Sequence, residues 1–223
     1  MKKILFLFII GIFLLISISL YASDWDIESP WTRSGTNISP SNPTDTVGNF
    51  YDIDFIPIGW AIDGAVAPGI LSTLTSTNSA RYRDFSGAAD NDVFLEWQVP
   101  YGIDTAVGVT FQVEGWITHA TAPANTETVR FILSGVSIGD SELLSSAQGA
   151  AITVIKTFNA TYVQYDRFIS GYSTVVTIAG LSAGELVILS LKRDTSDPQQ
   201  DGYAQAIGVG WLKIKYAIKL LGS

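Results

Sequence analysis

Few residues of this chain could carry out acid–base or nucleophilic chemistry. Its 223 residues include one histidine, His119, and no cysteine. A Ser-His-Asp hydrolase would therefore have to use His119 as its base, but this residue lies in the polar stretch THATAPANTET, where we expect a surface loop. Thiol catalysis and zinc sites built from histidine and cysteine clusters are excluded by residue count. We expect no nucleophile elbow and predict no catalytic residue.

Carboxylates are the next candidates, and they gather in turns. Asp90–Asp92 forms one group, and Asp194, Asp197 and Asp201 form another. Such hard oxygen ligands suit calcium, but neither group has the spacing of a twelve-residue calcium loop, and Asp and Asn are ordinary turn residues. We expect no obligatory cofactor and no defined metal ligands, with calcium as an open alternative. A glycosidase that pairs two carboxylates from distant strands also stays open, because such a pair leaves no local motif.

Aromatic side chains are the third candidate site. The chain has six tryptophans, and exposed tryptophan or tyrosine on a β-sheet suits stacking against sugar rings. By alternation, Trp97 points with the core residues, whereas Trp116 lies on the face opposite the apolar residues of its strand. We expect more than half of the aromatic residues to lie in the core or in a subunit interface. If the protein binds sugar, Trp116, Tyr162 and Tyr172 are the first positions to mutate.

The elements that must position these residues show the two-residue period of β-strands. The stretch Asp92–Ile117 holds two alternating runs, which Pro100 and Gly102 separate, and we expect them to form a hairpin. Further strands are expected at 51–58, 60–66, 80–85, 128–138, 151–158, 161–168, 174–179, 186–193 and 203–220. One short helix is predicted over Asp140–Gln148, with Gly149 just past its end. The pattern predicts an all-β fold, a two-sheet β-sandwich of the jelly-roll type.

The amino terminus has the pattern of an export signal. Lys2 and Lys3 precede the apolar run Ile4–Ile16, and a more polar stretch follows that ends in Ala22. The predicted organisation is a signal peptide over 1–22, an extended arm or small hairpin over 23–50, and the β-sandwich domain over 51–223. A retained membrane anchor is the alternative, because apolar character persists to Leu20.

Composition and charge set further limits. The formal net charge is -8, and only 15% of the residues are charged. An acidic chain disfavours non-specific binding to nucleic acid and to anionic membranes. A chain of this length buries enough surface to need no disulfide. We therefore predict a secreted protein, extracellular or at the cell surface, with no nucleic-acid partner and no membrane contact once the leader is removed.

Two stretches resemble structural proteins of viruses. Trp31–Gly48 is similar to a W-x-R-x-G-x-x-hydrophobic-S-P-x-N-x-x-D-x-V segment of phage tail-fibre and other virion fibre proteins. The matching residues are Trp31, Gly35, Ile38, Pro40, Asn42, Asp45 and Val47. Between Ala80 and Tyr216, the ordered blocks ARYRDF, DVFLEWQVP, VTFQVEGW, VVTIAGLSAGELVILSLKRDTSD and GVGWLKIKY resemble a module of phage and environmental structural proteins. The resemblance implies a structural or receptor-binding jelly roll, usually in an oligomer, with no catalytic residue.

Two functions of different classes follow. The main prediction is a non-enzymatic secreted structural protein, a subunit of an extracellular or virion fibre or filament that forms a homo-oligomer or polymer. It would assemble through its β-sandwich and through residues 23–56, which would add a strand to a neighbouring subunit's sheet. The alternative is a monomeric secreted carbohydrate-binding or adhesin module whose partner is a surface glycan.

Overall fold

The structure is a computed structural model that describes residues 31–34, 37–40, 50–73 and 80–219. The chain divides into two compact units, Asn49–Leu220 and a smaller one formed by Met1–Gly48 with Leu221–Ser223. In the smaller unit, β1 (Trp31–Ser34) and β2 (Asn37–Pro40) pair antiparallel. The organisation predicted for this stretch, an extended arm or a small hairpin, stays a prediction.

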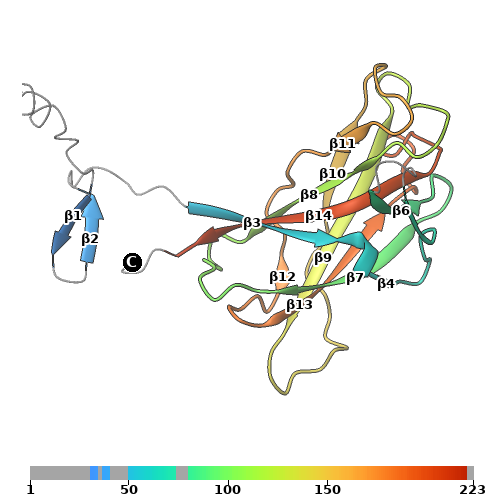
Figure 1. Ribbon diagram of the computed structural model, residues 1–223. Helices are drawn as coiled ribbons and strands as arrows, with labels where there is room; N and C mark the ends of the chain where they lie inside the picture. Colours follow the sequence, from blue (N-terminus) through green and yellow to red (C-terminus); the bar gives the residue numbers. More distant parts are fainter. Residues whose placement is uncertain (1–30, 35–36, 41–49, 74–79, 220–223) are drawn as a thin grey trace, which may run out of the picture. The chain divides into compact units, whose positions relative to one another are not determined.

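The larger unit is a β-sandwich of two mainly antiparallel sheets, which we name after their central strands (Figure 1). The β14 sheet contains β3 (Phe50–Pro57), β5 (Leu71–Thr73), β6 (Arg81–Phe85), β8 (Val109–Trp116), β11 (Arg167–Ile169) and β14 (Ile207–Ile218). The β13 sheet contains β4 (Ile62–Asp63), β7 (Asn91–Gln98), β9 (Thr128–Ile138), β10 (Ile152–Thr157), β12 (Ile178–Ala179) and β13 (Leu186–Arg193).

The strand order is that of a jelly roll, which confirms the predicted fold class. The β14 sheet has the order β11-β8-β14-β6-β5, with β3 also beside β14, and the β13 sheet has the order β10-β9-β13-β7-β4. Successive strands from β6 to β9 alternate between the sheets, and so do β11, β13 and β14. Neighbours within each sheet are therefore mostly far apart in the sequence.

The hairpin predicted within Asp92–Ile117 is wrong. β7 pairs with β13 and β4, whereas β8 pairs with β14 and β11, so the two runs lie in different sheets. Alternation identified the apolar face of each run correctly. It does not show which strand pairs with a run's edge, because two runs with apolar faces can lie side by side in one sheet or face each other in two sheets. The connection through Pro100 and Gly102 thus crosses from one layer to the other.

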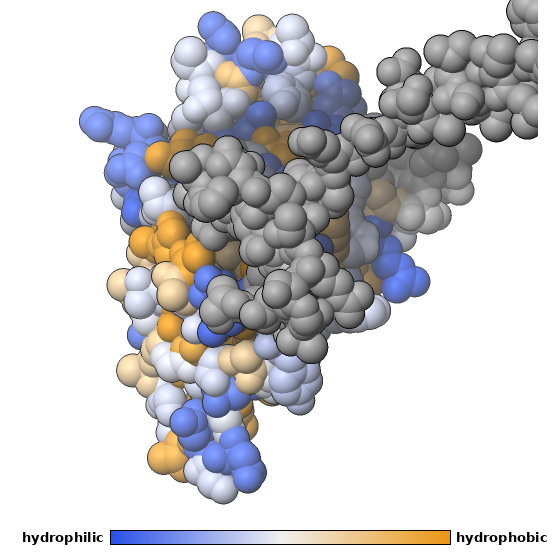
Figure 2. All heavy atoms as spheres, turned by 90° about the vertical axis from the view of Figure 1, so that its left-hand side faces the viewer, coloured by the Kyte–Doolittle hydropathy of each residue, from blue (hydrophilic) through white to orange (hydrophobic). Residues whose placement is uncertain are grey.

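The core lies between the two layers. Alternate residues of the central strands are buried there, among them Val93, Leu95, Trp97, Phe111, Val113, Phe131, Leu133, Leu189, Leu191, Leu212 and Ile214. Phe131 of β9 stacks on Phe168 of β11 across the layers, with ring centroids 6.3 Å apart. The indole N–H of Trp97 donates to Asp54 Oδ2 at 2.8 Å, so this buried polar group has a partner. Other apolar groups reach the surface, and Figure 2 shows them as orange patches between hydrophilic ends.

The helix predicted over Asp140–Gln148 is not formed. This segment is a loop with turns, which projects from the end of β9 (Figure 1). The N–H and the hydroxyl of Ser146 both donate to the carbonyl of Leu143, so the side chain takes an acceptor that a helix would use. Ser141 has a φ of 66°, outside the helical region. Leu143 and Leu144 are exposed, so no apolar face packs on the core to stabilise a helix.

β3 belongs to the chain's own sheet. It pairs antiparallel with β14 from Phe50 opposite Ile218 to Pro57 opposite Trp211. One edge of β3 thus has a partner in its own chain, and the predicted addition of residues 23–56 to a neighbouring subunit's sheet stays a prediction. The predicted signal peptide over 1–22 and most of the predicted arm lie outside the described residues.

No helix in the described part of the chain is long and apolar enough to cross a membrane.

Candidate functional site

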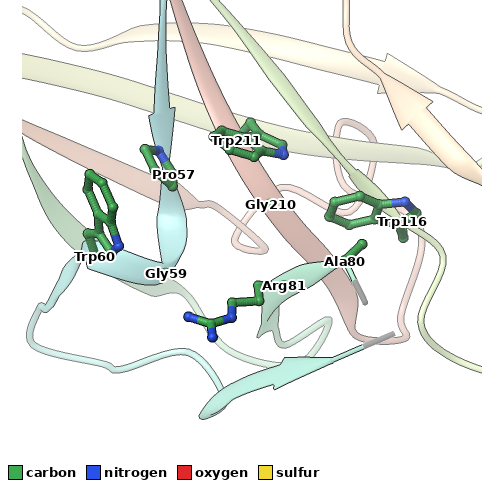
Figure 3. Close-up of a pocket in the computed structure, with 8 residues that line it drawn as sticks. All are labelled: Pro57, Gly59, Trp60, Ala80, Arg81, Trp116, Gly210 and Trp211. Carbon is green, nitrogen blue, oxygen red and sulfur yellow. The ribbon is translucent and has the colours of Figure 1, made fainter. Parts of the chain in front are cut away.

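A hollow at one end of the β14 sheet brings three tryptophans together (Figure 3). Its volume is about 390 Å³. It is lined by Pro57, Gly59, Trp60, Ala80, Arg81, Trp116, Gly210 and Trp211. These residues come from the end of β3, the turn after it, the start of β6, the end of β8 and the middle of β14. The site is thus assembled by strand pairing between segments that are distant in sequence.

Trp116 owes its position to Gly210 of β14, and Gly208 leaves room for its neighbour Tyr82. A Cβ atom on Gly210 would lie 2.2 Å from Cζ3 of Trp116, so only glycine leaves room for the indole here. The register of β14 against β8 also shifts between Val209 and Trp211, a β-bulge of the kind that re-aims a side chain. Gly208 lies opposite Trp116, and a Cβ there would come within 2.7 Å of the Tyr82 ring. The indole therefore lies over bare backbone.

Trp60 is displayed by a short 3-10 turn, Ile58–Trp60, that follows β3. Ile58 is fully buried, and the N–H of Ala61 closes the turn on the Ile58 carbonyl at 3.1 Å. Trp60 itself is 82% exposed, whereas Trp211, opposite Pro57, is 36% exposed. The buried isoleucine thus holds the turn that presents one indole almost entirely to solvent.

The polar groups around the hollow are mainly donors. The Arg81 side chain extends from β6 toward the side where Trp60 lies (Figure 3). No carboxylate is found among the eight described residues that line the hollow. Tyr82 lies beside Trp116, with ring centroids 6.5 Å apart. Burial, and to a lesser degree the charge of Asp84, raises the pKa of Tyr82, so its hydroxyl stays protonated at neutral pH.

Beyond the hollow, the same face of the β14 sheet carries a band of aromatic and charged side chains. We call Tyr51, Phe55, Glu114, Arg167, Tyr172, Lys213 and Lys215 the outer strip. Lys213 Nζ lies 2.7 Å from Glu114 Oε2, and Arg167 bonds to the other oxygen of the same carboxylate. Lys213 also lies over the ring of Phe55 at 5.1 Å. Lys215 lies between two tyrosines, 4.3 Å from the ring centre of Tyr51 and 5.4 Å from that of Tyr172.

The sequence found one member of the hollow and missed two tryptophans. Trp116 lies on the outward face, as alternation predicted, and lines the hollow. Tyr162 instead packs edge-on against buried Phe158, with ring centroids 5.1 Å apart. Tyr172 lies on the outer strip, outside the hollow. Trp211 could have been found, because alternation in β14 places it on one face with Lys213 and Lys215; Trp60 carries no such signal.

The first group of turn carboxylates is bound by the protein itself. Asp90 forms an ion pair with Lys192 at 2.6 Å and accepts the N–H of Thr195 at 2.8 Å. Asp92 accepts the N–H groups of Ala65 and Val66 at 3.1 and 2.9 Å. These carboxylates fix loops, as turn residues do.

The second group is likewise committed to protein partners. Asp194 pairs with Arg130 at 3.0 Å, and Asp197 accepts the N–H of Gln199 within its turn. Asp201 receives two hydrogen bonds from buried Arg193, at 2.9 and 2.7 Å. Across the part of the chain that is described, no three His, Cys, Asp or Glu residues gather as metal ligands would.

A Gly-x-Ser-x-Gly sequence does occur, at Gly135–Gly139, and our expectation of no nucleophile elbow overlooked it. Its Ser137 lies within β9, not at a strand-to-helix turn, and is buried with its hydroxyl donating to Glu185 Oε2 at 2.8 Å. His119 Nδ1 accepts the N–H of Thr121 in a loop, where it acts as a turn acceptor. The segment therefore has the sequence pattern of a nucleophile elbow but not the strand-to-helix turn that an elbow requires.

Comparison with protein-family models gives no match, and neither does comparison with curated proteins. Among solved structures, the chain is similar to CBM35 from Cellvibrio japonicus Abf62, with 10% identity, a TM-score of 0.39, and coverage of 76% of this chain and 100% of the other.

Two further solved structures are similar at 10% identity and a TM-score of 0.30. One is the protein of unknown function SO2946 from Shewanella oneidensis MR-1, with coverage of 81% of this chain and 93% of the other. The other is the family 11 carbohydrate-binding module of the cellulase Lic26A-Cel5E from Clostridium thermocellum, with coverage of 80% and 92%. At these values the likeness concerns the arrangement of strands alone.

Proposed function

We propose that the protein is a non-catalytic carbohydrate-binding module that binds sugar rings by stacking them on Trp60, Trp116 and Trp211. The observation that carries this proposal is the convergence of three indoles from separate elements around one open hollow. Single exposed apolar residues are normal on a protein surface, but clustered aromatic groups with a few polar neighbours are typical of a ligand site. The CH faces of a pyranose pack on an indole, and its hydroxyls need hydrogen-bond partners at the edge.

The polar neighbours support the same ligand class. Arg81 lines the hollow and carries hydrogen-bond donors, while Tyr82, the next residue of β6, points to the opposite face of that strand with its ring beside Trp116. An aromatic contact is worth about 0.5–1.5 kcal/mol beyond its buried area. Three such contacts, set against the cost of immobilising the ligand, suit a dissociation constant on the order of micromolar to millimolar.

The proposal includes export, because extended polysaccharides lie outside the cell and the first 22 residues have the pattern of a signal peptide. The fibre-subunit role and the homo-oligomer stay separate predictions. Sedimentation of the purified protein tests both, since a subunit of an assembly gives a multiple of the single-chain mass. A protein that sediments as one chain contradicts both.

The test of the proposed function is substitution in the hollow. Trp116→Ala and Trp211→Ala should each weaken retention on the polysaccharides bound by the unchanged protein, by about tenfold or more in affinity. Tyr101→Ala is the matched control, because Tyr101 is 87% exposed in the turn after β7 and outside the hollow. Far-ultraviolet circular dichroism of each variant shows whether the sandwich is intact.

Three results would overturn the proposal. The first is a protein that retains no glycan from a broad array, and the second is full binding by both tryptophan variants. The third concerns the non-catalytic part: release of reducing ends from a bound polysaccharide, abolished by replacing a single carboxylate, would make the protein a glycosidase.

A further inference from the structure

We infer, resting on the proposed carbohydrate-binding function, that the ligand is an anionic polysaccharide whose chain runs from the tryptophan hollow along the outer strip. The inference names the charge and the length of the ligand. It rests on three features of the β14 sheet: the continuity of its outward face, the aromatic groups along it, and the sign of its charges.

The outward face of β3 connects the hollow with the strip. Pro57 lines the hollow, and alternation places Phe55, Ile53 and Tyr51 on the same face. Phe55 is 57% exposed and Tyr51 is 50% exposed, so both rings have surface free for a ligand. From Pro57 to Tyr51 the strand advances about 20 Å at roughly 3.3 Å per residue. Several linked pyranose rings are needed to cover this length, and one ring cannot.

The charges on this face are opposite in sign to the charge of the whole chain. Arg81 in the hollow and Arg167, Lys213 and Lys215 on the strip give four cations, against the carboxylates of Glu114 and Asp84. The surplus is 4 - 2 = 2 positive charges on a chain with a formal net charge of -8. A local cationic patch attracts an anionic ligand even when the whole protein is acidic.

The acids of β3 point away from this face. Asp52 and Asp54 alternate with the outward residues of β3, and Asp54 accepts the indole N–H of buried Trp97. Asp84 lies on the outward face, two residues from Tyr82 and opposite Gly208, and accepts the hydroxyl of Thr118 at 2.6 Å. The charge of Asp84 is therefore counted with that of Glu114.

The cations differ in how they can act. The Lys213 side chain is nearly buried between Phe55 and Glu114, so it contributes to the field and not to direct contact. The Arg167 side chain is 53% exposed. Lys215 carries its ammonium between two exposed tyrosine rings, where a sugar carboxylate or sulfate can reach the charge while the sugar ring packs on an aromatic face. Arg167 and Lys215 are therefore the groups expected to contact the ligand.

The experiment is calorimetric titration of the purified protein with oligouronates of one to six rings and with their methyl esters. Esterification removes the charge and keeps the sugar ring, so each ester is a matched neutral probe. We expect affinity to rise with chain length, to fall about tenfold or more on esterification, and to fall with added salt. Lys215→Gln and Arg167→Gln should weaken binding of the acid form and leave binding of the ester unchanged. Lys192→Gln, a cation on the β13 sheet, is the control and should change neither.

The outcomes separate this inference from the proposed function. Equal affinity for acid and ester overturns the anionic ligand, and equal affinity for one ring and six rings overturns the extended site; in both cases sugar binding itself stands. Strip variants that change the sedimenting mass of the protein instead of its affinity would make the strip a contact between copies of this chain. Failure of the protein to bind any glycan removes the proposed function and this inference together.

Discussion

Two clusters of charged side chains lie in neighbouring parts of the sandwich and differ in their access to solvent. Arg193 of β13 points inward and is 0% exposed, with hydrogen bonds to Asp201 and to the carbonyls of Phe85 and Gln205. The cluster around Glu114 lies on the outward face of the β14 sheet. Both clusters join an acid to basic groups by short hydrogen bonds, yet only the outer one can meet a ligand.

The difference shows that charged residues alone do not mark a binding site. The guanidinium of Arg193 is surrounded by acceptors of its own chain, which tie the loop after β13 to the sandwich. In the outer cluster, Arg167 and Lys213 satisfy one carboxylate, and the Arg167 side chain keeps half of its surface exposed. We therefore assign stability to the inner cluster and ligand binding to the outer one, and three predictions test this division.

The largest expected effect is on the inner cluster. Asp201→Ala removes the carboxylate that accepts two hydrogen bonds from a fully buried guanidinium, and it leaves that charge uncompensated. Breaking a buried ion pair in this way costs about 3–5 kcal/mol. We expect urea unfolding to show a loss of this size in the free energy of unfolding. Asp197→Ala, which removes an acceptor only from an exposed turn, should cost about 1 kcal/mol or less.

Binding should separate from stability in these variants. Under conditions in which Asp201→Ala is folded, its affinity for a glycan should equal that of the unchanged protein, because Asp201 lies in the inner cluster and does not line the hollow. A folded Asp201→Ala variant with reduced affinity would show that the inner cluster also contributes to ligand binding, which contradicts the assignment.

A smaller stability effect and a large binding effect are expected at Gly210. Gly210→Ala places a Cβ atom 2.2 Å from the Trp116 ring, so the indole must move. Overpacking of this kind costs about 1–3 kcal/mol. The variant should fold and lose most of its sugar binding, because the ring it displaces forms one wall of the hollow. Gly171→Ala is the control, since its Cβ would meet nothing within 4 Å; equal binding by both variants would exclude Trp116 from the site.

The sequence predicted which residues face the core but not which strands lie side by side. Alternation separates Leu95 and Trp97 from their outward neighbours because the side-chain period of a strand is local. The pairing of β7 with β13 depends on contacts across almost a hundred residues, and the β7–β8 hairpin expected from proximity in sequence is not formed. Local pattern therefore indicated which residues of a strand face the core, but neither the sheet to which a strand belongs nor its neighbours.

The hollow could not be predicted from the sequence, because it too depends on which strands pair. Trp60, Trp116 and Trp211 meet because β3 and β8 both pair with β14, and the bulge at Gly210 sets the orientation of the ring between them. The predicted helix over Asp140–Gln148 failed for a different reason, since its flanking aspartate and glycine are also turn residues. The charge sign of the outward face could have been predicted once Trp211, Lys213 and Lys215 were placed together by alternation.

The smallest effect is expected at Glu114 and depends on pH. Burial alone would raise the pKa of Glu114, but the hydrogen bonds from Arg167 and Lys213 outweigh it and hold the pKa below its ordinary value. A carboxyl with a lowered folded-state pKa stabilises the fold fully above its unfolded pKa, which is about 4.3. This contribution is lost as the pH falls through the folded-state pKa.

Glu114→Gln should therefore lower the free energy of unfolding by about 1 kcal/mol at neutral pH, as expected for an ion pair whose partner is half exposed. Below about pH 4 the two stability curves should converge, because the unchanged protein loses the same charge by protonation. Urea unfolding across this pH range measures both effects. Curves that stay parallel would show that Glu114 does not hold its partners as an ion pair.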